Sequence, residues 1–166
     1  VMLINQQAAH ERILYEKYIA ALANPKRLTQ KLLFPIEMQV SQIEAAVVNE
    51  LIDDFALLGF ELDTDDTTVI IKGVPTDSVN DSVESILSQV IESYLLNSNE
   101  LQIDSRTNLV LSLAKNLSIK AGKLLNIEEM HLIIDGLFAC EMPYISPSGT
   151  KTFYLLSLEE IERKFL

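Results

Sequence analysis

The chain has 166 residues and 48% of them are hydrophobic, which suffices for one domain or for two small lobes that share a core. No apolar run has the length of a membrane span, and the first residues lack the charged region and cleavage site of a signal peptide. A formal net charge of -11 disfavours direct binding to duplex DNA, and the single Cys140 excludes an intrachain disulfide and a cysteine-rich zinc site.

The first predicted elements are a short strand and a long helix. Residues 1–4 are all apolar and predict a buried strand. Because the chain opens within this strand and not on Met, we expect it to be a piece of a longer protein. Residues 6–23 have apolar side chains at helical spacing, and the Asn24-Pro25 pair ends that helix. Gln7 and Glu11 lie four residues apart and share one face of the helix.

An extended segment and a helix–hairpin unit come next. Residues 30–40 alternate apolar and polar side chains at their end, and Pro35 predicts an edge strand or a break. Ser41 and Glu44 form the sequence of a capping box, which begins a helix expected to reach about Leu58. A polar turn within residues 60–71 then predicts a β-hairpin.

The second half of the chain is mostly helical. A helix is expected to begin at Asp81 and to break at Asn97-Ser98-Asn99. Further helices are expected over 104–118, after the Asn126/Glu129 capping box, and after the Ser157/Glu160 capping box. The last two are separated by a Pro- and Gly-containing loop over 142–149 and by a strand over 152–156.

The opening stretch, VMLINQQAAHERILYE, resembles the signature that begins the C-terminal domain of MutL-type DNA mismatch-repair proteins. That signature commonly has Asp-Gln-His-Ala, two residues, Glu, four residues and Glu. The matching positions are Gln6, Ala8, Glu11 and Glu16. Asn5 stands at the Asp position and Gln7 at the His position. The resemblance continues in patches over residues 113–122, 126–137, 146–152 and 153–165, and it looks bacterial.

The resemblance implies an α/β (α+β) fold in two lobes. A discontinuous lobe of residues 1–28 plus 100–166 would dimerise, and an inserted lobe of residues 29–99 would carry regulation and contact with a sliding clamp. In the full protein an N-terminal ATPase domain would bind ATP and magnesium, and this part would need no cofactor. The implied partners are a second copy of the chain, the mismatch-recognition protein MutS, the sliding clamp and, indirectly, DNA, in the bacterial cytoplasm and away from membranes.

In nuclease-competent relatives the same motifs bring together ligands of one or two divalent metals. By resemblance, this chain has replaced most of them: the substituted positions are Gln7, Lys115, Ser146, Ser148 and Thr150. Glu11 and Glu16 are the remaining candidate metal ligands. We therefore expect no catalytic residue and a non-catalytic platform for mismatch repair. The alternative is a metal-dependent endonuclease that nicks the strand to be repaired.

Each remaining polar candidate also has a purely structural interpretation. Glu11 and Glu16 would be solvated helix carboxylates that pair with Arg12 and Lys17. His10 would be a hydrogen-bonded, partly buried side chain and not a substitute ligand. His131 and Cys140 would belong to apolar surroundings and not to a metal site.

Residues 30–35, QKLLFP, resemble the short peptide by which repair proteins dock on the bacterial sliding clamp. Leu33 and Phe34 would fill an apolar pocket of the clamp, and Gln30 would fix the entry by hydrogen bonds. Pro35 is the last residue of the predicted clamp-binding set. The alternative is an ordinary amphipathic strand. The strands over 1–4 and 152–156 would flank the dimer interface, with a plain core position as their alternative.

Overall fold

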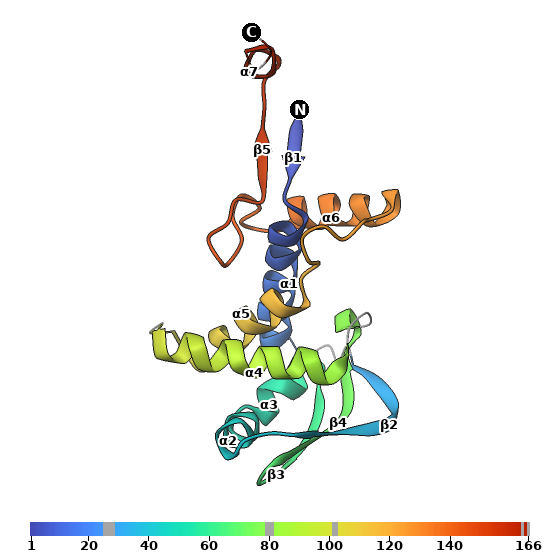
Figure 1. Cartoon of the computed structure of the whole chain (residues 1–166), viewed down its shortest axis with the longest axis vertical. Coiled ribbons are helices and arrows are strands. Elements are labelled where there is room, and N and C mark those ends of the chain that lie inside the picture. The colour runs from blue at the N-terminus through green and yellow to red at the C-terminus, as the bar shows by residue number, and fades with distance from the viewer. Residues whose placement is uncertain (25–28, 79–81, 101–102, 164, 166) are drawn as a thin grey trace. The chain divides into compact units, whose positions relative to one another are not determined.

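The computed structural model describes residues 1–24, 29–78, 82–100, 103–163 and 165, and it combines helices with antiparallel sheets, which confirms the predicted fold class. Figure 1 shows a pair of strands, β1 and β5, and a separate sheet of β2, β4 and β3. The chain divides into two compact units, one of residues 1–16 and 118–166 and one of residues 17–117. No helix within the described ranges is both long and apolar enough to cross a membrane.

The first unit contains a two-stranded sheet and the helices that follow each strand. Strand β1 (Met2–Ile4) pairs antiparallel with β5 (Phe153–Leu155) in the register Leu3↔Tyr154. Helix α1 (Gln6–Ala23), which contributes its first half to this unit, follows β1 directly. The other helices are α6 (Ile127–Ala139) and α7 (Leu158–Glu162).

A small core joins α1 to α6 within the first unit. Ala9, Ile133 and Leu137 are buried, and Ile13 packs against them at the partly buried edge. Gly136 permits this approach, since a Cβ at that position would lie 3.0 Å from the Cδ1 atom of Ile13. The core therefore depends on small residues where the two helices meet.

The second unit contains a three-stranded antiparallel sheet in the order β2-β4-β3. Its strands are β2 (Thr29–Gln39), β3 (Glu61–Asp65) and β4 (Thr68–Pro75). Its helices are α2 (Gln42–Glu50), α3 (Ile52–Leu57), the 3-10 turn η1 (Thr76–Ser78), α4 (Val83–Glu100) and α5 (Ser105–Leu117). Apolar side chains from both helices and strands fill its core, with Phe55 and Phe60 meeting edge to face at 5.4 Å.

The capping boxes predicted at Ser41, Asn126 and Ser157 are confirmed. Ser41, Asn126 and Ser157 each accept a hydrogen bond from the backbone three residues later, and the matching Glu accepts one in return. Asn5 caps α1 in a similar way, because its Oδ1 accepts a hydrogen bond of 3.1 Å from the N–H of Ala8. Helix starts were predictable because a cap needs only neighbouring residues.

The sequence predicted an edge strand or a break at Pro35, and β2 is an edge strand that continues through Pro35 while its pairing is interrupted there. Strand β2 pairs with β4 at both ends, and its register shifts between Lys31 and Ile36. Pro35 has no N–H to donate to the ladder, so the pairing is interrupted there.

Two predicted helix boundaries are wrong. The expected helix from Ser41 to Leu58 is two helices, because the buried Leu51 adopts non-helical angles (φ -101°, ψ 12°) between α2 and α3. The expected break at residues 97–99 is absent, and α4 continues to Glu100. Asn97 donates a 3.0 Å hydrogen bond to Asn108 of α5, so a tertiary contact keeps this polar stretch helical.

The helix start predicted at Asp81, with Glu84 at its capping-box position, falls on a residue outside the described ranges. The lobe boundaries at 28/29 and 99/100 stay a prediction. The compact units differ from them by grouping residues 17–24 and 103–117 with the inserted segment. Helices α4 and α5 pack against each other and therefore belong to the same unit.

Candidate functional site

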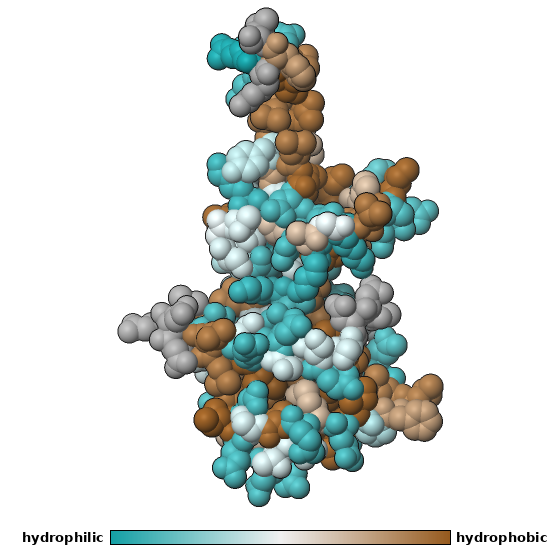
Figure 2. All heavy atoms as spheres, viewed as in Figure 1, coloured by the Kyte–Doolittle hydropathy of each residue, from teal (hydrophilic) through white to brown (hydrophobic). Residues whose placement is uncertain are grey.

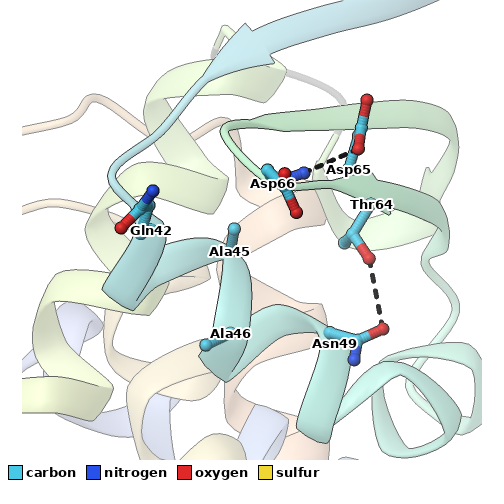
Figure 3. A pocket seen from close by; sticks show the side chains of 7 residues that line it. All are labelled: Gln42, Ala45, Ala46, Asn49, Thr64, Asp65 and Asp66. Carbon is cyan, nitrogen blue, oxygen red and sulfur yellow. Dashed lines mark hydrogen bonds between the residues drawn. The ribbon is translucent and has the colours of Figure 1, made fainter.

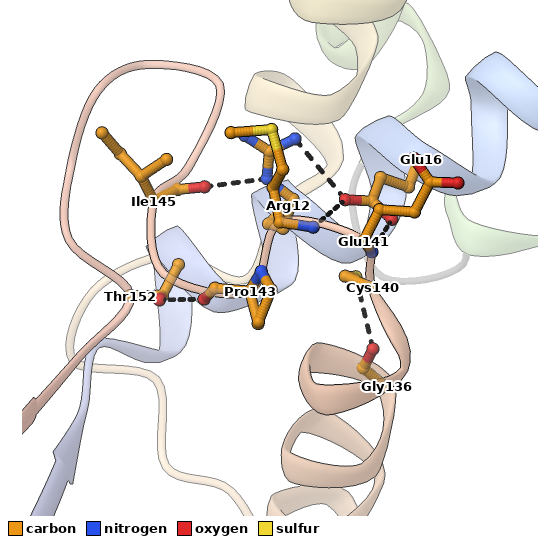
Figure 4. Close-up of polar contacts among 9 residues, drawn as sticks. Arg12, Glu16, Gly136, Cys140, Glu141, Pro143, Ile145 and Thr152 are labelled. Carbon is orange, nitrogen blue, oxygen red and sulfur yellow. Dashed lines mark hydrogen bonds and ion pairs between the residues drawn. The ribbon is translucent and has the colours of Figure 1, made fainter.

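The two carboxylates of the opening motif lie on α1 and contact the segment between α6 and β5. Glu11 is buried, and its Oε1 accepts a hydrogen bond from the hydroxyl of Ser148. Glu16 accepts hydrogen bonds from the backbone N–H groups of Glu141 (2.8 Å) and Met142 (3.2 Å), as Figure 4 shows. Both carboxylates therefore bind protein donors within the first unit.

Arg12 lies between these carboxylates along the helix. Its Nε donates a 2.8 Å hydrogen bond to the carbonyl of Ile145, and its guanidinium lies 3.6 Å from Glu16 (Figure 4). The ring of Tyr15 covers the guanidinium at 5.4 Å. The Arg12–Glu16 pair confirms one of the ion pairs expected from spacing. The other expected cation, Lys17, pairs with Asp77 of η1 at 2.7 Å.

The residues at this place do not fit a metal ion. Gln7, Ser146 and Ser148 bring neutral oxygen or nitrogen atoms where the metal-binding relatives would have stronger ligands. Lys115 belongs to α5 in the other unit. Among the described residues, no group of three or more His, Cys, Asp and Glu side chains converges on one point.

The histidines and the cysteine have structural surroundings. His10 is partly buried, and its Nδ1 accepts a 3.0 Å hydrogen bond from the backbone of Ile119. Because Nδ1 accepts a hydrogen bond, the ring proton lies on Nε2. His131 is exposed on α6. Burial, followed by the nearby Glu16 carboxylate, raises the pKa of the Cys140 thiol to about 11.

The predicted docking segment lies where β2 leaves its sheet. Leu33 is 95% exposed and Phe34 is 82% exposed, so neither is a core residue. Gln30 stays in the ladder opposite Val74, and Pro35 is exposed. The strand thus holds both ends of the segment while its apolar side chains point into solvent, and Figure 2 shows hydrophobic atoms projecting there.

The sheet of β1 and β5 exposes apolar side chains on both of its faces. Successive side chains of a strand point to opposite faces, so Met2 and Leu155 share one face and Leu3 and Tyr154 share the other. All four are at least 40% exposed. Figure 2 shows hydrophobic atoms gathered along both strands.

Aromatic rings extend this apolar region towards α6. The ring of Phe153 lies 5.4 Å from that of Phe138 and 5.7 Å from that of Tyr144. Phe138 and Tyr144 are both about half exposed or more. We call the two strands with their four exposed side chains the apolar sheet, and these rings adjoin it.

Sequence reasoning missed a polar hollow in the second unit. It encloses about 430 Å³ between α2 and the β3–β4 turn (Figure 3). Its floor is made by the small side chains of Ala45 and Ala46, and a hydrogen bond of 3.3 Å joins Thr64 to Asn49 at its side. The lining contains two carboxylates, Asp65 and Asp66, but no histidine, cysteine or basic residue. This set of side chains lacks a nucleophile paired with a base. In the sequence, the hollow is marked by the Ala45-Ala46 pair and by the acidic turn at Asp65-Asp66.

A partly buried polar cluster of this unit is structural. The hydroxyl of Tyr18 donates a 3.0 Å hydrogen bond to Asp77, which also accepts from Lys17. Burial, and then the charge and hydrogen bond of Asp77, raise the pKa of Tyr18 well above 10. The phenol therefore stays protonated and ties α1 to η1.

Comparison with known proteins agrees with the opening motif. A family model described as the MutL C terminal dimerisation domain matches residues 1–125. The chain is 39% identical over 99% of its length to a DNA mismatch repair protein MutL of Chlorobium phaeobacteroides (strain BS1), covering 27% of that protein. It is 39% identical to the protein of that name in Chloroherpeton thalassium and 36% identical to that in Prosthecochloris aestuarii, again over 99% of this chain, covering 26% and 27% of those proteins.

The chain thus spans about a quarter of the length of the curated relatives it matches. The family match covers most of the chain, and the relatives align almost from end to end with it. The chain belongs to the family of MutL C-terminal dimerisation domains of DNA mismatch-repair proteins.

Proposed function

We propose that this domain joins two copies of a mismatch-repair protein through the apolar sheet. The observation that carries this proposal is the exposure of apolar side chains on both faces of β1 and β5. A two-stranded sheet has two open edges and is marginally stable alone in water. A second copy would cover these edges and faces, since soluble monomers rarely expose large contiguous apolar patches.

Charge supports the same location for the dimer interface. Each copy has a net charge of -11, so two copies repel each other over most of their surfaces. The four exposed side chains of the apolar sheet carry no charge, and Lys151 beside them covers the ring of Tyr154 at 4.9 Å. Bringing these surfaces together removes apolar area from water without burying carboxylates.

A charge placed on the apolar sheet tests the proposal. We expect Leu155→Glu to weaken the dimer by at least about 30-fold in its dissociation constant, which corresponds to about 2 kcal/mol at a central interface residue. Sedimentation equilibrium of the 166-residue chain measures this. Leu33→Glu is the matched control, because Leu33 is even more exposed but lies in the other unit. An unchanged dissociation constant for Leu155→Glu would refute this location.

We also propose that residues 30–35 dock on a sliding clamp. The exposure of Leu33 and Phe34 supports this, because an ordinary amphipathic strand would turn one of two neighbouring apolar side chains into the core, and here both are exposed. Two stretches of ladder fix the ends of the segment, so little conformational entropy is lost when a pocket takes up its side chains.

Binding to a purified bacterial sliding clamp tests this second proposal. We expect Gln30→Ala with Phe34→Ala to reduce affinity at least tenfold in surface plasmon resonance. Gln42→Ala with Ile43→Ala is the matched control, since it also removes one amide and one exposed apolar side chain from the same unit. Equal losses for the two double variants would mean that residues 30–35 do not recognise the clamp.

We further propose that the domain is a non-catalytic platform that needs no cofactor of its own. Support comes from Glu11 and Glu16, whose oxygens already accept hydrogen bonds from protein donors. In the full protein, located in the bacterial cytoplasm, the dimer would hold two ATP- and magnesium-binding domains at high effective concentration. MutS would contact this assembly, and DNA would be bound indirectly. Manganese-dependent nicking of a supercoiled plasmid that Glu11→Ala abolishes would contradict the proposal.

A further inference from the structure

We propose that Glu11, Arg12 and Glu16 of α1 form a latch that holds residues 140–152 and thereby keeps β5 paired with β1. This inference rests on the proposed dimerisation through the apolar sheet, because it concerns what keeps that sheet formed. Figure 4 shows most of the contacts that make the latch. All of its residues belong to the first unit.

The latch begins where α6 ends. Cys140 is the C-cap of α6, and the next two backbone N–H groups, of Glu141 and Met142, donate to the two carboxylate oxygens of Glu16. Two charge-assisted hydrogen bonds to one carboxylate fix the direction in which the chain leaves the helix. The departure from α6 is therefore set by a side chain more than a hundred residues earlier.

The latch then holds the middle of the segment at two further points. Arg12 donates to the carbonyl of Ile145, and Ser148 donates to Glu11. Glu11 and Arg12 are buried to 6% and 7% exposure, respectively. Buried charges are costly unless they are paired. Loss of one partner therefore leaves another buried charge unpaired, which couples the stabilities of these contacts.

The held segment leads directly into β5. Its turn closes on itself through the N–H of Ser146, which donates to Thr150 at 2.8 Å. The next buried residue, Thr152, donates its hydroxyl to the carbonyl of Pro143 and accepts, through its own carbonyl, a 2.8 Å hydrogen bond from the N–H of Asn5. Thr152 precedes Phe153, the first residue of β5. The latch therefore fixes the turn that precedes β5 and positions β5 beside β1.

The short length of the sheet is the reason that a latch matters. Strands β1 and β5 have three paired positions, and an isolated two-stranded sheet is at best marginally stable in water. The apolar side chains of the sheet give little help before a second copy covers them. Contacts outside the sheet must then hold the strands together, and the latch supplies them.

Removing hydrogen-bond capacity with little change in side-chain size tests the latch. In the 166-residue chain, we expect Glu16→Gln with Ser148→Ala to speed amide hydrogen exchange at least tenfold over residues 141–156. Exchange in α4 and α5 of the second unit should match the parent chain. The dimer dissociation constant should rise at least fivefold. Glu128→Gln, an exposed glutamate early in α6, is the control and should leave both measurements unchanged.

The outcomes separate this inference from the proposed function. Unchanged hydrogen exchange over residues 141–156 would overturn the latch. Faster exchange that stops before β5, at residue 153, together with an unchanged dimer dissociation constant, would also overturn it. Leu155→Glu reports independently on the interface. If Leu155→Glu leaves the dimer intact while the latch variant still speeds exchange in β5, the latch stands and the proposed interface fails.

Discussion

At the scale of single residues, spacing along the chain predicted contacts only where the partners share a helix. The Arg12–Glu16 pair follows from positions four apart on α1. The contact of Glu11 with Ser148 joins residues 137 positions apart, so no local pattern contains it. Lys17 was expected to pair with the glutamates of α1 and pairs with Asp77 instead, because η1 brings a carboxylate to it. Long-range polar partners were therefore the part of the candidate site that sequence could not supply.

Cys140 offers a test at this scale. Burial and the Glu16 carboxylate raise the pKa of the thiol to about 11, above its ordinary value of 9.0. At pH 8 the thiolate fraction is then on the order of 0.1%, so alkylation by iodoacetamide should be on the order of 100-fold slower than in the urea-unfolded chain. Glu16→Gln should speed it, because it removes the carboxylate. Equal rates in the folded and unfolded chains would contradict the burial of this thiol.

The same thiol also gives the direction of a pH effect on stability. Its folded-state pKa lies above the unfolded value, so its contribution is complete below about pH 9 and is lost as pH rises towards about 11. In this window the unfolded thiol ionises while the folded thiol stays protonated.

At the scale of elements, the features that depend on neighbouring residues were predictable and those that depend on packing were not. The capping boxes at Ser41, Asn126 and Ser157 and the edge strand with interrupted pairing at Pro35 are local features and were confirmed. The continuation of α4 through residues 97–99 depends on Asn108 of α5 and was missed. The exposure of Leu33 and Phe34 depends on the register shift of β2, which the motif alone does not reveal.

Gly73 of β4 tests how β2 is held. It lies opposite Lys31 and Glu61, and a Cβ there would meet the Cγ2 atom of Thr29 at 2.7 Å. The β-branched Thr29 is stiff at χ1, so we expect Gly73→Ala to destabilise the second unit by about 1–3 kcal/mol in urea denaturation. Thr29→Ala should recover part of this loss in the double variant. If Gly73→Ala destabilises the second unit equally whether residue 29 is Thr or Ala, the clash lies elsewhere.

At the scale of the whole molecule, the resemblance carried by the opening motif and the later patches predicted the fold class and the family, which the structure and the comparisons confirmed. The division into lobes was less accessible, because it depends on how α4 and α5 pack and not on any boundary residue. The location of the apolar sheet also needed the fold. The prediction of a buried strand at residues 1–4 is wrong, because the structure pairs this strand with β5 in a two-stranded sheet whose apolar side chains are largely exposed.

Charge gives a prediction for the assembled molecule. Two copies with a net charge of -11 each repel, and salt screens such repulsion with a Debye length of about 10 Å at 0.1 M. Raising NaCl from about 0.05 M to about 0.5 M should therefore tighten the dimer several-fold in sedimentation equilibrium, because the apolar sheet has no ion pairs to lose. Weakening of the dimer with salt would indicate an interface built on charge pairs and would contradict the apolar one.

The paired ends of β2 have a mechanical consequence for any partner bound to Leu33 and Phe34. Ladder pairing on both sides of the register shift anchors the segment to β4, which is the central strand of its sheet. A force on the segment is thus resisted by the β2–β4 hydrogen bonds that precede it and by those that follow it. A partner bound to Leu33 and Phe34 would therefore transmit its pull through the edge strand β2 to the central strand β4.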